Sequence, residues 1–170
     1  VDVPSTTAAG DYPVSQTATG VYSTLAVTDA NDVVRVQPFG NLGVAKFTAK
    51  TGATAETVTV NNVAIDGGAG YTAGITGALP CENIKYKILG KNEYNTAVRN
   101  FVIDDTVPAN TVLQSIDVNG AAPYIYKIGT TGTWTAGPIS TQAAGTVIYI
   151  ALDDSTTPGD QPAPLASGAT

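Results

Sequence analysis

Residues 82–103 read ENIKYKILGKNEYNTAVRNFVI, and the pattern of this stretch decides the fold that we predict. Its first half alternates apolar and basic residues, in the order Ile84, Lys85, Tyr86, Lys87 and Ile88. Successive side chains of an extended chain point to opposite faces, so we expect the apolar residues inside and the two lysines outside. A polar turn at residues 92–95 follows, and Phe101 resumes the apolar face. The stretch predicts two β-strands joined by a turn.

Short runs of strand-forming residues, separated by turn residues, continue along the whole chain. Its 170 residues include 18 Gly and 10 Pro, with Thr and Val between them, and no window repeats apolar residues at helical spacing. A spacing of roughly 10–15 residues between strand centres is typical of a sandwich. The predicted strands are residues 20–28, 33–37, 42–49, 56–65, 83–89, 98–103, 112–118, 124–128 and 146–152.

Residues 82–116 resemble the prokaryotic conserved-repeat domain, an Ig-like β-sandwich found, often in tandem, in secreted and surface proteins. The likeness rests on the alternating strand, the turn at residues 92–95, a second strand ending at Asp105, and the corner at Val107 and Pro108. It extends over about two thirds of the chain. The resemblance implies an Ig-like β-sandwich and a location outside the cell. Together with the strand pattern, it gives the predicted fold class, an all-β chain that forms an Ig-like β-sandwich with an extended N-terminal segment. The family has no shared chemistry.

Three segments are expected. Residues 1–38 form an N-terminal extension, in which a polar linker leads to a hairpin whose strands, 20–28 and 33–37, flank a turn at 29–32. Residues 39–152 form the sandwich, with an exposed Gly-rich loop at 66–77. Residues 153–170 form a polar tail, which we expect to be extended and mobile unless something holds it.

Composition excludes several classes of function. The chain has 8 Lys and Arg against 14 Asp and Glu, and this balance argues against nucleic acid or an anionic membrane as a partner. No apolar run approaches the roughly 18–20 residues of a membrane span. Without His, the usual general base and the commonest metal ligand are missing. We therefore expect neither an enzyme nor a cofactor.

The lone cysteine, the lone tryptophan and the adjacent carboxylates are expected to have structural roles. We expect Cys81 to be a small packed residue rather than a link between subunits, and Trp134 to fill the core rather than stack on a ligand. The adjacent carboxylates at residues 104–105 and 153–154 are expected to be solvated, because neighbours on a strand face opposite ways.

Two binding or modification sites stay open. Calcium could bind the loop oxygens of Asp29, Asn31 and Asp32, although turn formation explains the same residues. Lys46 could form an isopeptide bond with one of three asparagines, although a plain surface lysine is the simpler interpretation. Those asparagines are Asn83, Asn95 and Asn100.

The chain begins at Val1 rather than Met, so we expect export with removal of a leader. No Asn-x-Ser/Thr sequon occurs, whereas the Thr-rich stretches leave glycans on threonine open.

The leading functional hypothesis is a structural subunit of an extracellular, pilus-like filament that polymerises head to tail. An extended segment of one subunit would complete the sheet of its neighbour by β-augmentation. The candidate donor residues share one strand face and are Val21, Ser23, Leu25 and Val27. The alternatives are a surface-layer or adhesin module, in which the hairpin pairs within its own chain and loop 66–77 binds, and a virion decoration protein.

Overall fold

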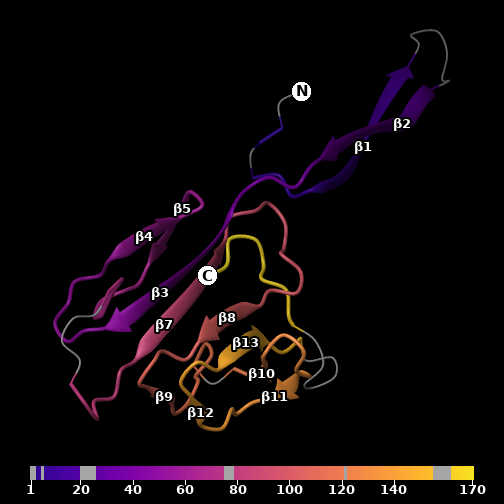
Figure 1. Cartoon of the computed structure of the whole chain (residues 1–170). Helices are drawn as coiled ribbons and strands as arrows, with labels where there is room; N and C mark the ends of the chain where they lie inside the picture. The colour runs from indigo at the N-terminus through magenta and orange to yellow at the C-terminus, as the bar shows by residue number, and fades with distance from the viewer. Residues whose placement is uncertain (1–2, 5, 20–25, 75–78, 121, 155–161) are drawn as a thin grey trace.

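The computed structural model describes residues 3–4, 6–19, 26–74, 79–120, 122–154 and 162–170, with the backbone alone at 16–19 and 26–32 (Figure 1). Its regular structure is β throughout, so the predicted all-β class is confirmed. Among these residues no helix is long and apolar enough to cross a membrane. The strands are β1 (Gly10–Thr19), β2 (Ala26–Val36), β3 (Leu42–Ala49), β4 (Thr57–Val60), β5 (Val63–Asp66), β6 (Tyr71–Thr72), β7 (Tyr86–Asn92), β8 (Ile103–Thr106), β9 (Val112–Leu113), β10 (Tyr124–Ile128), β11 (Thr135–Ala136), β12 (Gln142–Ala143) and β13 (Val147–Leu152).

The described strands pair in antiparallel sheets. The larger two have the orders β11-β10-β13-β8 and β6-β3-β7, and β4-β5, β9-β12 and β1-β2 form two-stranded ladders. The two larger sheets meet where the Lys46 side chain of β3 reaches Asp105 of β8. The ring of Phe101, just before β8, lies against Gly90 of β7.

Turn chemistry explains where the strands break. The predicted strands at 42–49 and 124–128 coincide with β3 and β10. The predicted strand at 56–65 is divided into β4 and β5, because Asn61 and Asn62 adopt φ values of 50° and 63° and close a two-residue hairpin. Asparagine tolerates this left-handed conformation, which two-residue hairpins with matching twist require.

Two small apolar clusters form the core. The first packs the β4-β5 hairpin on β3 through Ala45, Phe47, Val63 and Ile65, with Leu89 of β7 against it. The second gathers Val107, Ile139 and Ile148, with Leu113 and Ile116 among its partly buried neighbours.

Both faces of the β3-β7 ladder are covered, so the prediction that Lys87 faces solvent is wrong. Lys87 shares a face with Leu89 and is half-buried. Its ammonium donates a hydrogen bond to the Gly67 carbonyl at 3.0 Å and lies 4.9 Å from the centre of the Tyr71 ring. A lysine stem can pack on apolar surface while its charged end finds polar partners.

The N-terminal segment differs from the prediction in its pairing. Residues 10–19, expected to be linker, form β1, which pairs with β2 of the same chain. The expected turn at 29–32 is wrong because β2 continues through it. The register shifts between Val14 and Gln16, so that residues 30 and 31 stand opposite Ser15 as a β-bulge. The turn-forming residues Asp29, Asn31 and Asp32 therefore surround a bulge within β2 and do not form a turn.

The candidate donor residues fall on this hairpin. Val21, Ser23 and Leu25 lie outside the described residues. Val27 lies in β2 opposite Ala18 of β1, so its backbone pairs within its own chain.

The structure shows what holds the C-terminal tail. Leu165 and Val98 exchange two backbone hydrogen bonds, and Ala163 N–H donates to the Leu152 carbonyl. Ala169 and Gly168 pair with Asn92. The described part of the tail, residues 162–170, is therefore fixed to the body by backbone pairing.

Replacing Gly90 by Ala should destabilise the body by about 1–3 kcal/mol, because the added Cβ would overlap the Phe101 ring. Urea denaturation measures this change. Gly74→Ala is the matched control, since a Cβ at Gly74 meets no atom within 4 Å. Equal stability of the two variants would contradict the packing of Phe101 on β7.

Candidate assembly site

The hairpin of β1 and β2, residues 10–36, is called the arm. It extends away from the rest of the molecule as a two-stranded ribbon (Figure 1). Its strands contact each other along their length and make at most marginal contact with the other described strands. An isolated two-stranded ribbon is marginally stable in water at best, so the arm is the element of this structure that most needs a partner.

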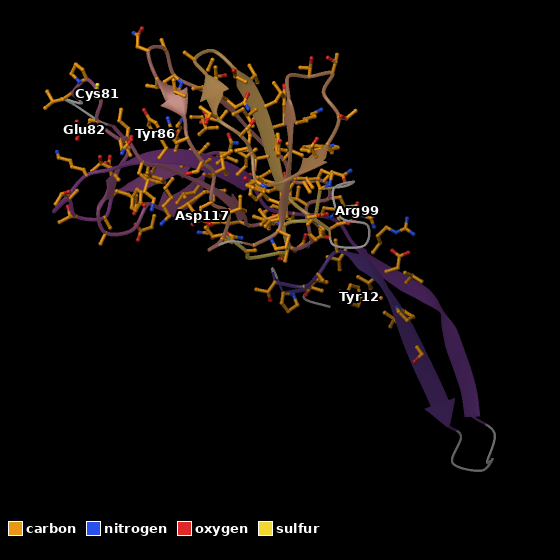
Figure 2. All side chains as sticks on the ribbon, turned by 90° about the horizontal axis from the view of Figure 1, so that it is seen from below. Tyr12, Cys81, Glu82, Tyr86, Arg99 and Asp117 are labelled. Carbon is orange, nitrogen blue, oxygen red and sulfur yellow. The ribbon has the colours of Figure 1, made fainter. Side chains whose placement is uncertain are left out.

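The root of the arm has one apolar face and one mixed face. Opposite residues of an antiparallel pair share a face, so Tyr12 with Val34, and Gly10 with Val36, line the apolar side. Tyr12 is 40% exposed, and its position on the arm is seen in Figure 2. Val33, on the other side, is 54% exposed.

An ion pair crosses the mixed face. Arg35 Nε and Nη2 donate to the two carboxylate oxygens of Asp11 at 2.7 and 2.9 Å. The bond from Arg35 lowers the pKa of Asp11 from its ordinary value. Both side chains are mostly exposed, so the pair fixes the register of the strands and adds little stability.

Asn95 ties the arm to the body. Its side-chain Oδ1 accepts a hydrogen bond from Phe39 N–H at 2.8 Å, and its Nδ2 donates to the Thr7 and Gln37 carbonyls at 2.9 and 3.2 Å. Its backbone N–H donates to the Phe39 carbonyl, and its carbonyl accepts from Ala9 N–H. Asn95 thus holds the chain on both sides of the arm, before β1 and after β2.

Close backbone packing fixes the same junction. Gly40 has a φ of 142°, and a Cβ there would overlap the backbone of Glu93 and Tyr94. Only glycine adopts this conformation without strain and also admits such an approach. Phe39, next to it, is 75% exposed, so a large apolar ring stands free at the base of the arm.

The turn that carries Asn95 also holds the other end of the chain. Asn92 is fully buried, and its Nδ2 contacts the carbonyls of Thr96, Leu165 and Ala166 at 3.0, 3.0 and 3.1 Å. Its Oδ1 accepts from Tyr94 N–H at 2.9 Å. Residues 92–96, called the joint turn, therefore connect the arm, the tail and β7. The sequence located this turn without indicating what it binds.

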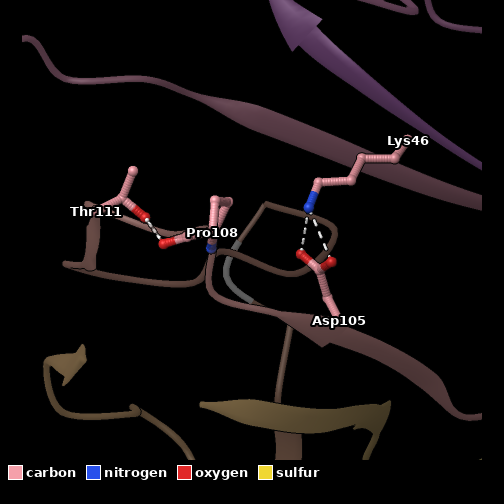
Figure 3. A network of polar contacts seen from close by, with 4 residues as sticks. All are labelled: Lys46, Asp105, Pro108 and Thr111. Atoms are coloured by element: carbon pink, nitrogen blue, oxygen red, sulfur yellow. Dashed lines mark hydrogen bonds and ion pairs between the residues drawn. The ribbon is translucent and has the colours of Figure 1, made fainter. Parts of the chain in front are cut away.

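Lys46 contacts none of the three asparagines proposed for an isopeptide bond. Its Nζ contacts both carboxylate oxygens of Asp105, at 2.6 and 2.8 Å (Figure 3), and lies 4.5 Å from the centre of the Tyr86 ring. Asn95 belongs to the joint turn, and Asn83 and Asn100 are exposed. Lys46 is therefore one half of a partly buried ion pair between the sheets.

Two of the structural interpretations are corrected. Cys81 is exposed rather than packed, because it lies in a turn after Pro80 with a φ of 67°, at the end of the body away from the arm (Figure 2). Trp134 is only partly buried and is not a core filler. The Lys127 ammonium lies over its ring and over the Tyr149 ring, 5.3 and 4.9 Å from their centres.

The carboxylates do not gather into a site. Asp104 and Asp105 lie on β8, where Asp104 is exposed and Asp105 contacts Lys46. Asp153 pairs through its backbone with Pro162 of the tail. Asp29, Asn31 and Asp32 lie in β2 with side chains outside the description. In the described part of the chain, no three His, Cys, Asp or Glu residues group as a metal ion would require.

Replacing Asn95 by Ala should free the base of the arm while the body stays folded. Three side-chain hydrogen bonds are lost, each worth about 1 kcal/mol. We expect faster amide hydrogen exchange at Phe39 and faster proteolysis within residues 37–40.

Asn83→Ala is the matched control, because it removes an exposed asparagine elsewhere on the body. If the Asn95 variant exchanges and is cleaved like this control, Asn95 does not hold the arm.

Comparison with known proteins gives no further guide to function. No family model, no curated protein and no solved structure significantly matches this chain. The arm and its joint turn therefore carry the functional argument by their geometry.

Proposed function

We propose that this chain is a structural subunit of an extracellular filament and that it joins copies of itself through the arm. The observation that carries the proposal is the arm itself, a two-stranded ribbon that leaves the body and makes at most marginal contact with the other described strands. Such a ribbon gains stability when a neighbouring subunit covers it or extends its ladder.

The surface of the arm fits a role in assembly. Tyr12, Val14 and Val33 expose apolar area at its root, and Phe39 adds an exposed ring at the joint. Scattered apolar residues are normal on a surface, but these four lie on one projecting element and its base. Covering them on a neighbour would supply the hydrophobic part of the contact energy.

The joint turn gives the contact a direction. Asn95 and Gly40 hold the arm at one fixed place on the body, so each subunit presents it in the same way. An arm that docks on a different surface of the next subunit makes a heterologous contact, and such contacts repeat into open helical fibres.

The proposed contact differs from the single donor strand expected from the sequence. Val27 is already paired with Ala18, so a neighbour would receive a hairpin, which still has two outer edges. The Ig-like sandwich and the cell-surface location implied by the resemblance remain part of the proposal.

A surface-layer or adhesin module is the second candidate. The pairing of β1 with β2 inside one chain favours it, because a self-contained module needs no strand from a neighbour. The two functions differ in whether assembly needs the arm. A filament subunit without the arm would no longer polymerise, whereas a self-contained module would keep its oligomeric state.

Deleting residues 1–38 should abolish polymerisation and leave a folded body, because both apolar clusters lie beyond this segment. Electron microscopy and sedimentation of the full chain and the truncated chain measure the effect, and circular dichroism checks the fold. We expect fibres from the full chain and single particles from the truncated one.

A full chain that never polymerises would contradict the filament, as would a truncated chain that still forms fibres. A flat lattice that survives the deletion would favour the surface-layer module.

A further inference from the structure

We infer that the arm of a second copy pairs with the edge of β7 that faces away from β3. This inference rests on the proposed function, because it names the surface that the arm would reach. It follows from the direction of the main-chain groups of β7 and from the distribution of charge along the chain.

The ladder with β3 fixes which residues of β7 point outward. Ala49 N–H donates to the Lys85 carbonyl, and Glu93 N–H donates to the Asn41 carbonyl, so the odd-numbered residues on this side face β3. Alternate residues of an antiparallel strand direct their main-chain groups to opposite edges. Tyr86, Ile88, Gly90 and Asn92 therefore direct theirs away from β3.

One end of this outer edge already binds an extended segment. Asn92 N–H donates to the Ala169 carbonyl at 2.9 Å, and its carbonyl accepts from Gly168 N–H at 2.8 Å. In the described part of the chain, no backbone partner pairs with the outward groups of Tyr86, Ile88 and Gly90. Gly90 is itself buried against the Phe101 ring, so the part of the edge that can pair with a strand is at Tyr86 and Ile88.

On the opposite edge of the sheet, other segments of the same chain occupy both ends. On β3, the Leu42 carbonyl accepts from Asn61 Nδ2, and β6 pairs with Thr48 and Ala49. The same alternation leaves only Val44 and Lys46 with open outward groups between these two contacts.

Charge favours the arm as the occupant of the β7 edge. Residues 42–50 and 85–92 hold five of the eight basic residues of the chain and no acidic residue. Two of the five are in ion pairs, Lys46 with Asp105 and Lys91 with Glu93, and the other three are Lys50, Lys85 and Lys87. Residues 1–38 hold four acidic residues and one arginine. Opposite charges on the two surfaces steer their encounter and disfavour other pairings.

Length and direction fit a second copy. β1 has 10 residues and β2 has 11, so either can span the open edge. The arm of the same chain leaves the joint turn pointing away from β7 (Figure 1), so the pairing strand comes from another molecule.

The test removes one outward N–H from the full chain. Ile88→Pro deletes the N–H that would bond to the incoming strand and spares the bonds to β3. We expect the concentration needed for polymerisation to rise at least about tenfold, with the body still folded by circular dichroism. Ile88→Ala is the matched control for the side chain, and Val44→Pro is the control for the other edge.

Three results would overturn the inference. They are an Ile88→Pro variant that polymerises like Ile88→Ala, a Val44→Pro variant that alone fails, and equal effects of proline on both edges. If the arm deletion still abolishes fibres in these cases, only the docking edge is wrong and the proposed function stands.

Hydrogen exchange of the wild-type chain gives a readout that does not depend on any variant folding. On polymerisation, the amides of Tyr86 and Ile88 should slow at least about tenfold, and those of Val44 and Lys46 should not. Unchanged exchange at the β7 edge in fibres would overturn the inference.

Discussion

The hydrogen bonds of the joint turn are the constraint on which the arrangement of the molecule depends. Asn95 binds the chain on both sides of the arm, and Asn92, three residues earlier, binds the tail. Asparagine suits both places because one amide group donates and accepts at the same time. A turn rich in hydrogen bonds can therefore set the direction of an arm that projects from the body.

The body and the arm differ in where apolar side chains are buried. Phe47, Ile65 and Ile148 are buried in clusters that need nothing from residues 1–38. Tyr12, Val14 and Val33 of the arm are exposed, and its two strands pair with each other. A body that contains the apolar clusters, and an arm whose strands pair with each other, are the properties that assembly through the arm would require.

Sequence reasoning succeeded where alternation and turn chemistry agree and failed where tertiary packing decides. It located β3, β10 and the turn at 92–95, because regular alternation and polar punctuation mark them. It missed β1, because this segment contains a proline and small polar residues that do not indicate a strand. The strand forms by pairing with β2. Lys87 was misplaced because a second layer covers its face, and no local pattern reports such a layer. The role of Asn95 depends on contacts 56 to 88 residues away.

A density map of the native assembly, at a resolution that separates strands, tests the central claim most directly. We expect each arm to leave its own joint turn and to lie as added strands along the outer edge of β7 in the next subunit. Arms folded back on their own bodies, or particles that contain one chain each, would contradict the claim that this protein builds an assembly by lending its arm to a neighbour.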